Sequence, residues 1–308
     1  MASKSKRMKK KMQILVPTDF SRASRAGARF AIQWASQQNV HLVFAHVLRI
    51  IRLTRWNDKQ YDRFAASERT LYTKKLAAFV ADLQRRLPLP PGSWSSVLIE
   101  GITTHGGLQD YCRQHPGIDL VCMGTQGADK RSRRLFGTMT SSFILQSDTP
   151  VIAVPAAYRR KPISQITYAS DLADSSRELQ HVVSLARPLD AKVGILHLQE
   201  AGEVTIDPET LKKIWKRQSG QNIKVEFRRA DPSLSIAGNL ERTARALHPS
   251  LMVLFSNRSR TFFQTLLYPS SAERLSLHTT IPILVLNKRE SASGKHDRAR
   301  PKLNASVR

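Results

Sequence analysis

Cysteine and long apolar segments are scarce in this chain of 308 residues. Its two cysteines, Cys112 and Cys122, form no CxxC pair and leave no second pair for a metal site. This usage fits a reduced intracellular protein, and we expect a cytoplasmic one. No apolar run reaches the roughly 18 residues of a membrane-spanning helix. The apolar stretch near the N-terminus meets Pro17 and Asp19 too early for a signal peptide.

Acidic residues are also few. The chain has 24 Asp and Glu against 49 Lys and Arg, a formal net charge of +25. Residues 1–11 carry six basic and no acidic side chains, and residues 288–308 carry seven basic and two acidic ones. Neither segment has apolar periodicity, so we expect two basic disordered tails. Such tails either bind nucleic acid without sequence preference or only keep the protein soluble, and the charge leaves both readings open.

The length suggests two domains, and an internal repeat supports that division. The segment ILVPTDFSRAS, residues 14–24, resembles ITYASDLADSS, residues 166–176. Further along, HLVFAHV resembles KVGILHL, and TPVIAV resembles IPILVL. We therefore expect one domain at residues 12–157 and a second at residues 163–287, joined by a short basic linker.

Each repeat alternates short apolar strands with helical patterns. Near-continuous apolar runs are typical of parallel strands that helices cover on both faces. The sequence thus predicts an α/β fold of two tandem five-stranded parallel sheets. In the first domain we expect strands at 12–17, 41–48, 94–100, 119–123 and 151–154, and helices at 21–37, 56–87, 104–115 and 138–147. In the second we expect strands at 165–169, 192–198, 222–229, 251–255 and 282–286, and helices at 174–189, 208–219, 233–247 and 270–278.

Glycine is scarce too, yet seven of the 14 glycines fall between residues 101 and 137. After the fourth expected strand come Gly124 and Gly127, and after nine intervening residues Gly137 and Thr138 begin a helix. Glycines let backbone N–H groups approach an anion, and a helix N-terminus favours negative charge. The pattern therefore predicts a site for a phosphate chain. The alternative is that these glycines only close a strand-to-helix loop.

Several motifs of the first half, taken together, resemble the universal stress protein (UspA) family, and the whole chain resembles its tandem two-domain members. The motifs are ILVPTDFS, FAHV, LVCMGTQG, LFGTMTSSFI and TPVIAVP. The resemblance implies a Rossmann-like, adenine-nucleotide alpha-hydrolase-like fold whose domains pair through their last strands, here 151–154 and 283–286. It also implies ATP binding in the first domain, because the glycine pattern is the family's mark of the ATP-binding kind. Whether Mg²⁺ accompanies the ATP is left open.

The resemblance assigns roles to ten residues of the first domain. Pro17, Thr18 and Asp19 would lie beside the adenosine, and Val47 would line the adenine pocket. Met123 and Gly124 would approach the ribose. The phosphates would meet Gly127, Gly137, Thr138 and Met139. Asp19 has an alternative role as the N-cap of the following helix.

The second domain departs from the ATP-binding pattern. Ser256, Ser259 and Pro269 replace the three glycines, Ser270 replaces Thr138, and a proline has no N–H to offer a phosphate. We expect a degenerate copy that binds no ATP and serves as an internal dimer partner. His46 and His197, at equivalent strand ends, are expected to be partly buried structural residues.

These features predict a nucleotide-responsive stress protein rather than an enzyme. No GxxxxGK[ST], GxSxG or HExxH motif occurs, although slow ATP hydrolysis by a positioned water needs no motif. The expected output is a conformation or a contact, with a homodimer as a further option. The alternative is a nucleic-acid-binding module that uses its basic tails and keeps a vestigial nucleotide pocket.

Overall fold

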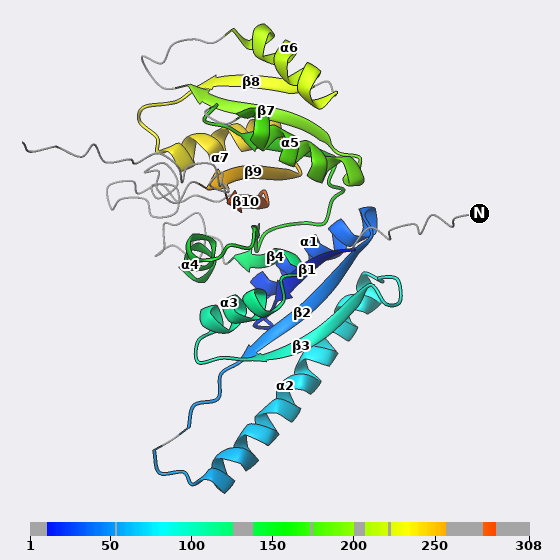
Figure 1. Ribbon diagram of the computed structural model, residues 1–308, viewed down its shortest axis with the longest axis vertical. Helices are drawn as coiled ribbons and strands as arrows, with labels where there is room; N and C mark the ends of the chain where they lie inside the picture. The colour runs from blue at the N-terminus through cyan, green and yellow to red at the C-terminus, as the bar shows by residue number, and fades with distance from the viewer. Residues whose placement is uncertain are drawn as a thin grey trace, which may run out of the picture.

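A computed structural model describes residues 11–52, 54–125, 138–172, 175–199, 207–220, 223–256 and 280–287. These residues form one ten-stranded sheet in the order β3-β2-β1-β4-β5-β10-β9-β6-β7-β8 (Figure 1). The first five strands come from the first half of the chain and the other five from the second half. Within each half all paired strands are parallel, as the apolar runs predicted.

In the first half the expected strands and helices are present, with ends shifted by at most a few residues. The helices begin at polar caps: the Ser21 side chain accepts from Ser24 N, Asn57 accepts from Gln60 N, and Thr103 accepts from Gly106 N. The elements are β1 Met12–Pro17, α1 Arg22–Gln37, β2 Val40–Leu48, α2 Asp58–Arg86, β3 Trp94–Glu100, α3 Thr104–Gln114, β4 Ile118–Thr125, α4 Thr138–Gln146 and β5 Val151–Pro155.

The described part of the second half follows the same order, and its first two helices are shorter than those of the first half. The helix expected at 174–189 ends earlier, because Pro188 tightens its last turn into the short 3₁₀ helix η1, Arg187–Leu189. The other elements are β6 Gln165–Ala169, α5 Ser175–Ala186, β7 Lys192–Gln199, α6 Pro208–Ser219, β8 Lys224–Arg229, α7 Ile236–Leu247, β9 Leu251–Ser256 and β10 Ile283–Asn287. The expected helix at 270–278 and both basic tails, apart from Lys11, lie outside the described residues.

The two halves join through their last strands. β10 pairs antiparallel with β5, with Leu284 opposite Ile152, which is the pairing that the resemblance implied. Apolar side chains on each face of the sheet form a core that runs across this seam. One face carries α1, α2, α5 and α6, and the other carries α3, α4 and α7. No helix in the described part of the chain is long and apolar enough to cross a membrane.

Polar contacts at the C-terminal end of α1 also hold the halves together. The Gln37 amide accepts from Ile163 N at 2.8 Å and donates to the carbonyl oxygens of Ile163 at 3.1 Å and Leu189 at 3.3 Å. One turn earlier, Arg160 Nε donates to Gln33 Oε1 at 2.7 Å. One face of α1 thus binds both the linker and the second half.

Candidate functional site

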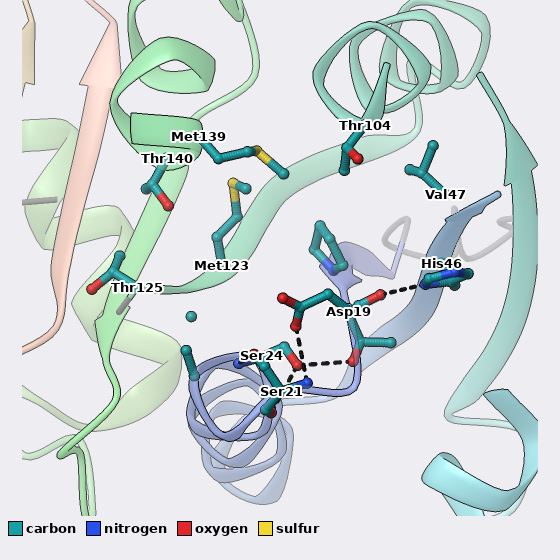
Figure 2. A pocket seen from close by; sticks show the side chains of 14 residues that line it. Asp19, Ser21, Ser24, His46, Val47, Thr104, Met123, Thr125, Met139 and Thr140 are labelled. Atoms are coloured by element: carbon teal, nitrogen blue, oxygen red, sulfur yellow. Dashed lines mark hydrogen bonds between the residues drawn. The ribbon is translucent and has the colours of Figure 1, made fainter. Parts of the chain in front are cut away.

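A cavity of about 320 Å³ opens at the carboxyl ends of β1, β2 and β4 (Figure 2). This volume is at the lower end of the range of about 300–1,000 Å³ that is usual for small-molecule sites. Figure 2 shows Asp19, Thr104, Met123 and Met139 around the same space. The residues that line it are Pro17, Thr18, Asp19, Ser21, Ala23, Ser24, His46, Val47, Thr104, Met123, Gly124, Thr125, Met139 and Thr140.

The turn after β1 forms one wall of the cavity. Thr18 Oγ1 accepts a hydrogen bond from Phe20 N at 2.9 Å, and Phe20 has a φ of 66°, in the left-handed region. The Nδ1–H of His46 donates to the carbonyl oxygen of Thr18 at 2.8 Å. Tyr72 stacks on the His46 ring with 4.8 Å between centroids. His46 therefore fixes the conformation that carries Asp19 into the cavity, and it also lines the cavity itself.

The second half builds the same turn. Ser170 Oγ accepts from Leu172 N at 3.0 Å, Leu172 has a φ of 63°, and His197 Nδ1 lies 2.9 Å from the carbonyl oxygen of Ser170. The two histidines thus support equivalent turns, in line with the structural role that the sequence predicted.

Asp19 supplies a carboxylate to the cavity. Its Oδ1 accepts from Ser21 N at 3.0 Å, whereas the N-cap of α1 is Ser21 and not Asp19. Burial alone would raise the pKa of Asp19, but hydrogen bonds from Ser21 and Ser24 outweigh it and hold the pKa below its ordinary value. The carboxyl is therefore ionised at neutral pH and acts as a hydrogen-bond acceptor.

The packing of α1 against β4 requires a glycine at position 124, which the sequence analysis missed. A Cβ at this position would lie 1.8 Å from the carbonyl oxygen of Ala23 in α1. A Cβ at Gly27 would lie 2.6 Å from Gly124 N. The two glycines therefore let the backbones of α1 and β4 touch, which brings the first turn of α1 to the cavity.

The N-termini of α1, α3 and α4 all meet the cavity. Ser21 caps α1, Thr104 is the first residue of α3, and Met139 and Thr140 belong to the first turn of α4. Free N–H groups and the helix dipole make each of these ends favourable for negative charge. Asp19 is the single carboxylate among the described residues that line the cavity.

Seven of the ten residues that the sequence predicted as a site line this cavity: Pro17, Thr18, Asp19, Val47, Met123, Gly124 and Met139. Gly127 and Gly137 lie outside the described residues, and Thr138 is the first residue of α4. The sequence analysis missed Ser21, Ala23, Ser24, His46, Thr104, Thr125 and Thr140. For Ser21 and Thr104 a signal was available, because both stand at helix starts that follow expected strands.

The second half lacks the close contact between helix and strand. Leu179 stands at the position of Gly27 and Ser256 at that of Gly124. Both residues carry a Cβ, and a Cβ at either glycine of the first half would clash with the neighbouring backbone. Helix α5 therefore cannot pack as closely against the end of β9 as α1 packs against β4. Ser259, Pro269 and Ser270, which the sequence analysis compared with the phosphate-binding residues, lie outside the described residues.

A parallel α/β sheet with a cavity at its carboxyl edge, surrounded by helix N-termini, has the architecture of nucleotide-binding α/β domains. Residues 12–155 match the model of the universal stress protein family, and this half of the chain belongs to that family. No curated protein matches the chain in a sequence comparison.

Solved structures extend the likeness over both halves. A universal stress protein from Archaeoglobus fulgidus DSM 4304 is 15% identical with a TM-score of 0.63, over 90% of this chain and 96% of that one. A putative universal stress protein from Pseudomonas aeruginosa UCBPP-PA14 is also 15% identical, with a TM-score of 0.55, over 89% of this chain and 92% of that one. At this identity the two likenesses show the fold.

Proposed function

We propose that the chain binds ATP in the cavity of its first half and acts as a nucleotide-responsive regulatory protein. The observation that carries the proposal is the convergence of three helix N-termini on one cavity that also holds the ionised Asp19. Phosphates suit the helix ends, and hydroxyl or amino donors suit the carboxylate. ATP offers both kinds of group in one molecule.

The ATP would lie with its adenosine between β1 and β2. Pro17, Thr18, Asp19 and Val47 would contact the adenosine, and Met123 and Gly124 the ribose. The phosphates would extend toward the start of α4, to Gly127, Gly137, Thr138 and Met139. Asp19 is the one carboxylate among the described residues that line the cavity. A Mg²⁺ ion bound with the ATP would therefore have phosphate and water oxygens as its main ligands.

The second half, residues 163–287, would serve as an internal partner of the first, residues 12–157. Helix α1 connects the two, because its first turn lines the cavity and its last turn holds Ile163 and Leu189 through Gln37. A ligand that shifts the start of α1 would also bias the contacts at its end. The output would then be a conformation or a contact rather than a chemical product.

Filling the cavity by mutation tests the site. Thr104→Trp places an indole at the first residue of α3, where it occupies the cavity and leaves the N-cap Thr103 intact. We expect ATP binding, measured by isothermal titration calorimetry, to be lost. The matched control is Ile236→Trp, since α7 begins at Ile236 behind the equivalent N-cap Ser235. This control should bind one ATP per chain, as the unmodified protein should.

Mass spectrometry of nucleotide extracted from freshly purified protein identifies the bound molecule. ATP that binds the folded state should also raise the melting temperature. The proposal is wrong if Thr104→Trp binds ATP as well as the unmodified chain does. It is also wrong if the unmodified chain binds two ATP molecules and Ile236→Trp binds one, because both halves would then bind ATP.

A further inference from the structure

Exposed apolar side chains gather at one end of the first half. Among the described residues five large apolar side chains are exposed, and four of them are Ile51, Phe64, Leu71 and Ile102. The four lie in the loop before α2, in the first half of α2 and in the loop after β3. Residues 49–52, 54–71 and 101–103 are called the distal surface below.

The distal surface projects from the domain. Between Asp58 and Lys75 the single buried residue of α2 is Ala65, whereas the end of the helix buries Leu76, Phe79, Val80 and Leu83 against the sheet. Figure 1 shows the start of α2 and the loop before it extending past the edge of the sheet. An unsupported helix of this length is marginal in water, so its exposed apolar groups call for a partner.

Specific contacts hold the parts of the distal surface together. Arg49 Nε donates to the carbonyl oxygen of Ile102 at 3.2 Å and links the two loops. The rings of Trp56 and Phe64 are 4.8 Å apart. Arg69 forms a salt bridge with Glu100, just before the second loop. Side-chain contacts therefore order the distal surface, on which Ile51 is 64% exposed to solvent and Ile102 is 93% exposed.

The charge of this surface indicates the kind of partner. It has six basic and three acidic residues. Asp58 is already paired with Arg52, and Arg69 with Glu100, while Arg55, Lys59 and Arg63 have no carboxylate partner among the described residues. A second copy of the chain would bring two positive surfaces together, which is unfavourable. A nucleic acid would match the cations but would leave the isoleucines in water.

We propose that the distal surface binds an anionic lipid bilayer. Arg55, Lys59 and Arg63 would contact the lipid headgroups. The side chains of Ile51, Phe64 and Ile102 would enter the boundary between the headgroups and the acyl chains. A convex, projecting element with isolated apolar tips suits a flat and deformable surface. The inference is independent of the ligand in the cavity, although Val47 and Thr104 place the cavity beside this surface.

Vesicle co-sedimentation of the full chain tests the proposal. The protein should bind vesicles of phosphatidylcholine mixed with phosphatidylglycerol, should bind phosphatidylcholine alone much less, and should dissociate as salt rises. The double variant Ile51→Ser/Ile102→Ser should bind the mixed vesicles roughly tenfold more weakly, because two apolar contacts are lost. The matched control is Ile214→Ser, since Ile214 is also exposed and stands among Lys213, Lys216 and Arg217 of α6. It should bind as the unmodified chain does.

A second pair of variants tests the charge. Arg55→Gln/Arg63→Gln should weaken binding to the mixed vesicles, and Lys216→Gln/Arg217→Gln on α6 should not. Equal binding to both kinds of vesicle, or no binding, would overturn the proposal. So would undiminished binding by the isoleucine double variant, because the lipid would then meet another part of the chain, such as the basic tails. An equal loss in Ile214→Ser would indicate non-specific adsorption and overturn it too.

Discussion

Replacing Gly124 by alanine is expected to lower the free energy of unfolding by about 3 kcal/mol or more, as severe overpacking does. The new Cβ would lie 1.8 Å from the carbonyl oxygen of Ala23, which is backbone and has no rotamer to change. Relief requires α1 to move away from β4. Because Ala23 and Ser24 of α1 line the cavity, the variant should also lose ATP affinity. Urea unfolding and calorimetry measure the two effects.

Gly238→Ala is the matched control for this substitution. Gly238 lies in the first turn of α7, and its new Cβ would meet the nearest atoms at 3.4 Å and 3.5 Å, which is ordinary contact. Alanine is also the better helix former, so stability should stay equal or rise slightly. If Gly124→Ala unfolds at the same urea concentration as Gly238→Ala, the close packing of α1 against β4 is not what the glycine provides.

Much of the fold could be predicted from the sequence because the repeat occurs in strands with clear boundaries. β1, β3 and β6 have the bounds that the sequence predicted. The family resemblance also predicted seven residues of the cavity, and six of them lie at the carboxyl ends of strands, where the ligands of parallel α/β sheets bind. The pairing of β5 with β10 was available only from the family resemblance, since an apolar strand does not specify which edge it will meet, and its antiparallel orientation was not predicted.

The remaining features depend on distances between segments that are far apart in the chain. Gly124 was assigned to ligand approach, because a sequence does not show that Ala23 lies against it. Thr140 enters the cavity through the packing of α4, which helical periodicity alone does not orient. The length of α2 was predicted, but its projection beyond the sheet depends on where β2 and β3 end.

Separating the halves should have the other large effect. Removing residues 158–308 leaves β5 without its partner β10, and all five residues of β5 are buried in the complete chain. An uncharged, exposed edge strand is a template for pairing with another chain. We therefore expect residues 1–157 to dimerise or aggregate in sedimentation velocity, whereas the full chain has this edge occupied.

The geometry of the seam suggests how the truncated chains would associate. In the full chain Ile152 lies opposite Leu284, and both side chains are fully buried. A second copy of β5 can lie antiparallel in the same place, with its own Ile152 replacing Leu284 as an apolar side chain of similar volume. Adding a separately produced second half, residues 158–308, should compete for the edge and convert the self-associated first half into an equimolar complex. A truncated chain that stays folded by circular dichroism and monomeric at high concentration would mean that the seam contributes little to holding the two halves together.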